Sequence, residues 1–295
     1  MTTETSAKDS KPTPRKTPKF VAMNALRYHR QSLIRSLESQ TNTHLLCYVS
    51  GLEAEINRDD TTGFVDMLFN VPQSGSIDLL LHTPGGQIDV AEKLMALLRA
   101  KVEDGGKLRI IVPDFAKSAG TLMVLGADTV IMSDSSELGT IDPQVMLLDG
   151  SGQRSMHSVL HYLQAHEEYE KMVRENQTDP AARAMYDKFE PATLNKLKGV
   201  SERARKFAEN LLKPRGVNYT AIVSELMNIN EYPSHGQPLL WETVKNRIGL
   251  DNVEYLPQTD EQWRRYWELY CHLRLAIKDD QKIFESSIAS LLIDG

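Results

Sequence analysis

The chain has 295 residues, of which 41% are hydrophobic and 25% are charged, a composition typical of a globular protein with one large or two small domains. The formal net charge of −6 argues against a nucleic-acid surface or an anionic membrane as a partner. Cys47 and Cys271 are too few for a disulfide framework, and we expect both to be free thiols of a cytoplasmic protein. We also expect no membrane span, since no window is apolar over the required length.

The chain begins with a segment that has little to bury. Residues 1–19 are rich in Thr, Lys and Pro, and we expect a disordered tail there, not a signal peptide. We place the main domain at 20–258. It opens with a helical pattern, "NALRYHRQSLIRSLESQTN", and continues with the apolar run "HLLCYVSG", which indicates a buried strand.

Strand and helix patterns then alternate over the middle of the chain. "SIDLLLHTPGG" predicts a strand and a glycine turn, "QIDVAEKLMALLRAKVEDGGK" an amphipathic helix, and "LRIIVPDFA" another strand. A short helix at "KSAGTLMVLGA" and a strand at "DTVIMS" follow. Short connections between such elements are typical of βαβ crossovers and therefore of parallel strands. The predicted fold class is α/β.

The second half of the chain has a different character. Long, strongly charged helical patterns predict a helical insertion at about 153–215, which could form a lid or an oligomerisation arm. Residues 259–295 are amphipathic throughout and begin with a Thr-Asp pair that suits a helix cap. We therefore expect one long C-terminal helix over 259–295.

Two turns rich in small residues stand at corresponding places in successive βα units. Gly85 and Gly86 follow the first strand, and the turn there could be a simple tight turn, a phosphate cradle or an oxyanion hole. The phosphate site is disfavoured because the P-loop lysine is missing. Ser118 opens the next helix, either as an N-cap or as a nucleophile. Adjacent parallel strands end at one sheet edge, so the two turns can be neighbours.

Three blocks resemble the Clp/crotonase superfamily of serine peptidases, and most closely its serine dehydrogenase proteinase branch. They are "LLLHTPGGQIDVAEKL", "FAKSAGTLMVLGADTVIMSDSSELGTIDPQ" and "YPSHGQPLLWETVKNRIGL", and the similarity covers about 40–255. The resemblance implies a Clp/crotonase-like spiral of βαβ units and a nucleophilic Ser118. It also implies oxyanion donors at the N–H groups of Gly86 and Ala119, and self-association into a ring or stacked trimers.

The general base departs from the family pattern. Asp142 stands where the resemblance places the histidine, and His235 stands at the position of the orienting aspartate. We therefore hypothesise a triad of Ser118, His235 and Asp142, with the last two exchanged. Both residues could instead serve turn chemistry beside proline and glycine. Lys171 is the alternative base, as in a Ser-Lys dyad, although its helical pattern suggests a solvated face.

No cofactor or metal is expected. His157, His161 and His166 have a spacing that could hold zinc, but they lack the H-E-x-x-H pattern. Three functions remain open: an ATP-independent serine endopeptidase acting on peptides or proteins through an acyl-enzyme on Ser118, a crotonase-type acyl-CoA enzyme, and a catalytically degenerate scaffold.

Overall fold

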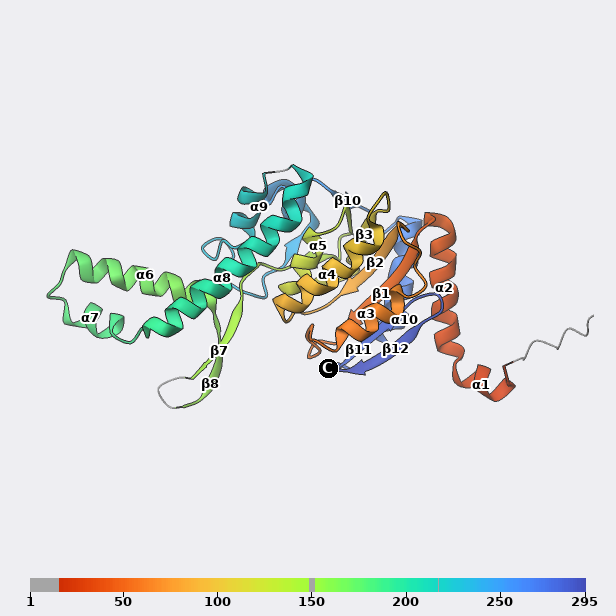
Figure 1. Cartoon of the computed structure of the whole chain (residues 1–295), viewed down its shortest axis with the longest axis horizontal. Helices are drawn as coiled ribbons and strands as arrows, with labels where there is room; N and C mark the ends of the chain where they lie inside the picture. The colour runs from red at the N-terminus through yellow and green to blue at the C-terminus, as the bar shows by residue number, and fades with distance from the viewer. Residues whose placement is uncertain (1–15, 149–151, 217) are drawn as a thin grey trace, which may run out of the picture.

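The structure is a computed structural model that describes residues 16–148, 152–216 and 218–295 (Figure 1). Its centre is a seven-stranded sheet with the order β10-β5-β3-β2-β1-β11-β12. The strands are β1 (His44–Ser50), β2 (Ile77–His82), β3 (Leu108–Ile111), β5 (Thr129–Met132), β10 (Val253–Tyr255), β11 (Gln281–Glu285) and β12 (Ser290–Asp294). The five strands from β10 to β1 run parallel, whereas β11 and β12 are added antiparallel at one edge.

Helices cover both faces of this sheet. They are α2 (Ala25–Thr41), α3 (Asp60–Leu68), α4 (Ile88–Val102), α5 (Ala119–Leu125) and α10 (Glu261–Arg274). Alternate side chains of a strand point to opposite faces: Leu46 and Tyr48 of β1 pack with α3, α4 and α5, whereas Leu45 and Cys47 pack with α2 and α10. Burial on both faces explains why these strands are almost wholly apolar. The predicted α/β fold is confirmed.

A second, smaller sheet lies where the parallel strands end. It consists of β4 (Phe115–Ala116), β6 (Glu137–Leu138) and β9 (Leu239–Leu240). Thr83, just after β2, forms an isolated parallel bridge with Ala116 of β4. The chain therefore continues from the large sheet into the small one at the edge that carries both small-residue turns.

The predicted helical insertion begins with a hairpin instead of a helix. The hairpin consists of β7 (Gln144–Leu148) and β8 (Arg154–Ser158). The helices that follow are α6 (Val159–Glu175), α7 (Pro180–Tyr186), α8 (Pro191–Leu212), the 3₁₀ turn η1 (Lys213–Arg215) and α9 (Tyr219–Leu226). Figure 1 shows α6 and α7 projecting away from the sheet, while α8 returns to contact α5 and α9. The π-helical turn η2 (Thr243–Arg247) then leads to β10.

The prediction of one helix over 259–295 is wrong beyond Arg274. α10 ends there, and the remaining residues form the antiparallel pair β11–β12. The turn at 278–280 breaks the helical pattern, and β11 pairs with β1 through long-range contacts that a local pattern does not contain. At the other end, 1–15 of the predicted tail lie outside the described residues. Residues 18 and 19 belong to helix α1 (Pro18–Met23), which Thr17 caps.

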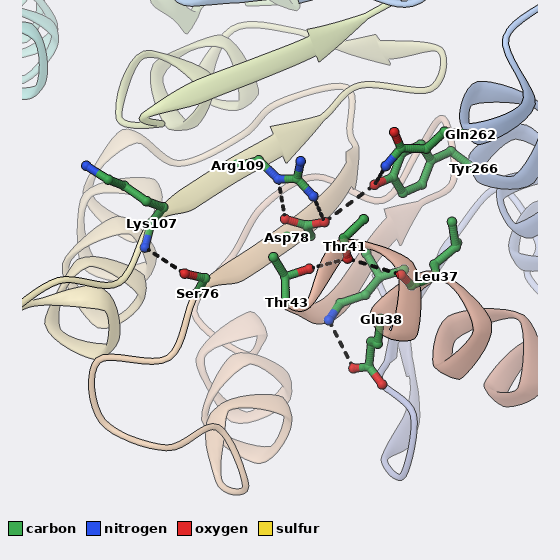
Figure 2. A network of polar contacts seen from close by, with 11 residues as sticks. Leu37, Glu38, Thr41, Thr43, Ser76, Asp78, Lys107, Arg109, Gln262 and Tyr266 are labelled. Carbon is green, nitrogen blue, oxygen red and sulfur yellow. Dashed lines mark hydrogen bonds and ion pairs between the residues drawn. The ribbon is translucent and has the colours of Figure 1, made fainter.

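A polar network fastens α10 to the sheet (Figure 2). Arg109 of β3 donates to both carboxylate oxygens of Asp78 on β2, at 2.7 and 2.5 Å. The Tyr266 hydroxyl of α10 donates to Asp78 Oδ2 at 3.4 Å, and Gln262 donates to Tyr266. Asp78 is buried, and a buried carboxylate needs such partners. None of the helices in the described ranges is long and apolar enough to cross a membrane.

Candidate active site

The turn between β2 and α4 has two glycines in backbone conformations that other residues seldom adopt. The φ angle is 108° at Gly85 and 140° at Gly86. A neighbouring loop fixes both peptides, since Ile56 N donates to Gly85 O at 2.6 Å and Gln87 N donates to Ile56 O at 2.9 Å. A Cβ on Gly86 would overlap the Ile56 backbone. The close approach of the two backbones therefore requires glycine.

Ser118 lies in a strained turn between β4 and α5. Its φ of 51° and ψ of −112° are unusual for serine, and a strained strand-to-helix turn of this kind exposes the nucleophile in α/β-hydrolases. Backbone bonds join this turn to the glycine turn: Thr83 N donates to Phe115 O at 3.1 Å and Lys117 N donates to Thr83 O at 3.0 Å. A Cβ on Gly85 would lie 2.8 Å from Ser118 Cβ. The two turns are neighbours, as predicted from the parallel strands.

Two N–H groups beside Ser118 have no hydrogen-bond acceptor among the described residues: those of Gly86 and Ala119. The carbonyl of Phe115, one helical turn before Ala119, accepts from Thr83 N instead. Ser118 itself makes no side-chain cap bond to the helix that it precedes. The N–H groups and the hydroxyl are therefore available to a bound molecule.

A cavity of about 720 Å³ opens at these groups. Gly86, Ser118 and His235 line it together, although they come from distant parts of the sequence. Apolar side chains, among them Ile88 and Met156, form other parts of the lining. Polar and charged residues, among them Asp89 and Arg203, line the rest, and a cavity of this size suits a small or extended ligand.

His235 and Asp142 come together at the edge of the cavity. His235 Nδ1 lies 3.8 Å from Asp142 Oδ2, too far for a hydrogen bond. The Asp142 side chain is 3% exposed, whereas that of His235 is 36% exposed. Ser158 Oγ donates to Asp142 Oδ1 at 2.7 Å, and Gln144 Nε2 donates to Asp142 Oδ2 at 2.7 Å. Ser158 and Gln144, which the sequence did not identify as site residues, therefore supply hydrogen bonds to the Asp142 carboxylate.

Gln144 contacts the imidazole of His235 as well as Asp142. Its Nε2 lies 3.4 Å from His235 Nδ1 and donates to both the carbonyl and the carboxylate of Asp142. These two bonds assign the amide orientation, because the alternative would turn the amide oxygen toward Asp142. The amide nitrogen has two hydrogens, and both are donated to Asp142, so the 3.4 Å contact does not assign the tautomer of His235. As the base for Ser118, His235 needs its proton on Nδ1, facing Asp142.

Among the described residues that line the cavity there is no lysine. Lys171 lies on α6 with its side chain 76% exposed, 3.9 Å from Glu175, and does not line the cavity. Lys117 Nζ binds Glu137 Oε1 at 2.6 Å and lies 3.4 Å from the Leu138 carbonyl. This ion pair engages the Lys117 amine with a carboxylate.

His82 ends β2 directly before the glycine turn and is buried against Phe115 and Tyr270. The Tyr270 hydroxyl donates to Asp114 Oδ2 at 2.8 Å, so His82 Nδ1–H donates to the Tyr270 oxygen at 3.3 Å. Burial, and then the charge of Arg274, lowers the pKa of His82 to about 3. The ring is neutral near pH 7 and is packed within the fold.

The three histidines of the insertion do not converge on a metal site. His157 Nε2 contacts Ser155 Oγ at 2.7 Å, and His161 Nδ1 contacts Ser158 Oγ at 2.9 Å. His166 is buried farther along α6. Among the described residues, none of the three belongs to a group that could hold a metal ion.

Similar proteins include two uncharacterized proteins of Methanocaldococcus jannaschii. One is 26% identical over 244 residues, which are 79% of this chain and 76% of that protein. The other is 30% identical over 126 residues, or 39% of this chain and 42% of that protein. Two solved structures of the 1510-N membrane-bound stomatin-specific protease are also similar. A lysine-to-alanine mutant with a substrate peptide has 15% identity and a TM-score of 0.35, covering 78% of this chain and 98% of its own. A serine-to-alanine mutant has 16% identity and a TM-score of 0.38, covering 72% and 97%.

The family model for ClpP-like SDH-type serine proteinases matches residues 17–230. This range contains Gly86, Ser118, Ala119 and Asp142, and it ends before His235. The match extends over more than half of the sequence and includes both small-residue turns. The chain belongs to the family of ClpP-like SDH-type serine proteinases.

Proposed function

We propose that this chain is a serine endopeptidase that hydrolyses peptide bonds through an acyl-enzyme on Ser118. The observation that carries the proposal is the strained Ser118 turn, whose hydroxyl lies on a cavity beside two unpaired N–H groups. A buried N-cap serine would need neither the unusual backbone angles nor the cavity. Backbone strain at a cavity is typical of a site where a reacting group is held in place.

The proposed reaction starts with attack of Ser118 Oγ on the carbonyl carbon of the peptide. The N–H groups of Gly86 and Ala119 stabilise the negative charge that develops on the carbonyl oxygen. His235 accepts the serine proton and then donates it to the leaving amine, which breaks the peptide bond and leaves an ester on Ser118. A water molecule, deprotonated by His235, then hydrolyses the ester and restores the serine.

Asp142 is the proposed orienter of His235. Bringing His235 Nδ1 from 3.8 Å to hydrogen-bond distance of Asp142 Oδ2 needs a shift of about 1 Å. Asp142 Oδ2 already accepts from Gln144 and keeps a second lone pair for His235 Nδ1–H. Catalytic hydrogen bonds often tighten only when substrate binds, so the longer contact is compatible with this role.

The proposed substrate is a peptide or an unfolded protein segment. The chain has no P-loop motif, so bond cleavage itself requires no nucleotide. We further propose that the chain self-associates into a ring or stacked trimers and acts in a reducing compartment such as the cytoplasm. The exposed Met146 and Met156 of the β7–β8 hairpin support an assembly surface, and Cys47 and Cys271 are both unpaired thiols. Light scattering after size-exclusion chromatography tests the assembly.

A degenerate scaffold is the second candidate, favoured by the contact of Gln144 with Asp142 and His235. In this arrangement His235 Nδ1 stays 3.8 Å from Asp142 Oδ2, so Asp142 does not orient the proposed base. A crotonase-type enzyme would use the two N–H groups on an acyl-CoA thioester and would need no serine nucleophile.

A fluorophosphonate probe separates these functions. We expect wild type to be labelled, and Ser118→Ala and His235→Ala to lose labelling, with His44→Ala, at the start of β1 and outside the cavity lining, as a control histidine variant that labels normally. Full labelling of His235→Ala would remove His235 as the base, and normal labelling of Ser118→Ala would overturn the nucleophile. A folded oligomer that never labels favours the scaffold. Binding of acyl-CoA without labelling favours the crotonase-type enzyme.

A further inference from the structure

A group of potential metal ligands lies away from the cavity, between α2 and α10. His29 comes from α2, and Glu268 and His272 come from α10. One ligand atom from each of the three lies within 4.8 Å of the others. Glu268 and His272 are four residues apart on one helix, a spacing that places both side chains on the same face. In the part of the chain that the structure describes, no other group of this kind occurs.

The three side chains make no polar contacts with other described residues. The imidazoles of His29 and His272 meet edge to face, with ring centroids 4.7 Å apart. Within the described ranges, neither ring nor the Glu268 carboxylate makes a hydrogen bond or an ion pair with another residue. His272 is half-buried, whereas the other two are exposed and can change rotamer. The site is therefore accessible and its ligands are free to bind.

The donor set identifies the class of ion. Two imidazole nitrogens and one carboxylate oxygen are ligands that Zn²⁺ accepts, with a fourth position left for water. Ca²⁺ and Mg²⁺ prefer oxygen ligands and are disfavoured. Zinc–ligand bonds of about 2.0–2.2 Å place ligand atoms roughly 3.4 Å apart, so atoms that lie within 4.8 Å of one another must approach by up to about 1.4 Å. We propose that His29, Glu268 and His272 bind one Zn²⁺ ion.

A zinc ion at this site would link α2 to α10. Both helices cover the same face of the sheet, and their buried side chains share one hydrophobic cluster. His29 precedes the two α10 ligands by about 240 residues in sequence, so the metal would close a long loop of the chain. Tyr270 lies between the two α10 ligands and contacts His82 at the start of the glycine turn. The zinc ion would therefore hold α10 in place, the helix that packs behind the candidate active site.

The test uses the full chain after removal of metal with a chelator. Zinc titration by calorimetry, the visible spectrum with Co²⁺, and the thermal midpoint are measured for wild type, His29→Ala, His272→Ala and Glu268→Gln. His161→Ala is the matched control, because it removes an exposed histidine elsewhere. We expect one zinc per chain, a higher midpoint with zinc, and at least about tenfold weaker binding in each of the three variants.

Several results would overturn the proposal. These are no zinc binding by wild type, wild-type affinity in both His29→Ala and His272→Ala, or loss of binding in His161→Ala. Unchanged affinity and Co²⁺ spectrum in Glu268→Gln would overturn the three-ligand site. Circular dichroism of each variant separates lost binding from lost folding. None of these readouts depends on peptidase activity.

Discussion

Lowering the pH from 7 to 5 should destabilise the fold through His82. In the unfolded chain this histidine has an ordinary pKa of about 6.5, whereas burial and the nearby Arg274 lower its pKa in the fold to about 3. Protonation therefore favours the unfolded chain. The contribution of neutral, buried His82 to the stability of the fold is fully present above pH 6.5 and is lost as the pH falls toward 3. At pH 5 the unfolded chain gains about 2 kcal/mol from this one proton.

Urea unfolding at pH 5, 6 and 7, followed by circular dichroism, measures the effect. The comparison protein is His82→Gln, which cannot titrate in this range. Buried carboxyls such as Asp60 and Glu285 have raised pKa values and shift stability the opposite way, but they do so in both proteins. The free energy of unfolding of wild type should fall about 2 kcal/mol more than that of the variant. Parallel pH profiles for the two proteins would refute the reasoning.

Three further substitutions test the site and its supports. Asp142→Asn should lower kcat for a fluorogenic peptide about 10⁴-fold, because an amide cannot hold the productive tautomer of the histidine; an unchanged kcat would exclude Asp142 as orienter. Gly85→Ala should lower the same rate about a hundredfold, because its Cβ would lie 2.8 Å from Ser118 Cβ and displace the serine; Gly105→Ala, where a Cβ meets nothing within 4 Å, is the control. Lys282→Met should lower the free energy of unfolding by about 3–5 kcal/mol in urea, because it leaves Asp60 buried without its partner at 2.8 Å; a loss below about 1 kcal/mol would show that the pair contributes little.

The sheet and its crossover helices could be predicted because their signals are local. β2 is six consecutive buried residues followed by a glycine turn, and α4 repeats its apolar positions at helical spacing. The β11–β12 pair has no such signal. β11 contains Lys282, which reads as a solvated helix position but is buried against Asp60, 222 residues away. A local pattern cannot reveal that partner.

The residues of the candidate site likewise include some that have a local sequence signal and some that have none. Ser118 and Gly86 could be identified because each follows a strand in successive βα units, and parallel strands bring such turns together. Gln144 and Ser158 could not, since their contacts with Asp142 depend on the pairing of β7 with β8, where these two residues lie opposite each other. The proximity of His235 and Asp142 came from the resemblance alone, as 93 residues separate them in sequence.

Gln144 connects the hairpin to the chemistry. The amide nitrogen of this residue donates to Asp142 Oδ2 and lies 3.4 Å from His235 Nδ1, so it contacts both the proposed base and its orienter. Gln144 is also the first residue of β7, and β7 pairs only with β8 among the described strands. A peptide or a second copy of the chain that pairs with this hairpin would therefore act directly on a residue that contacts both Asp142 and His235.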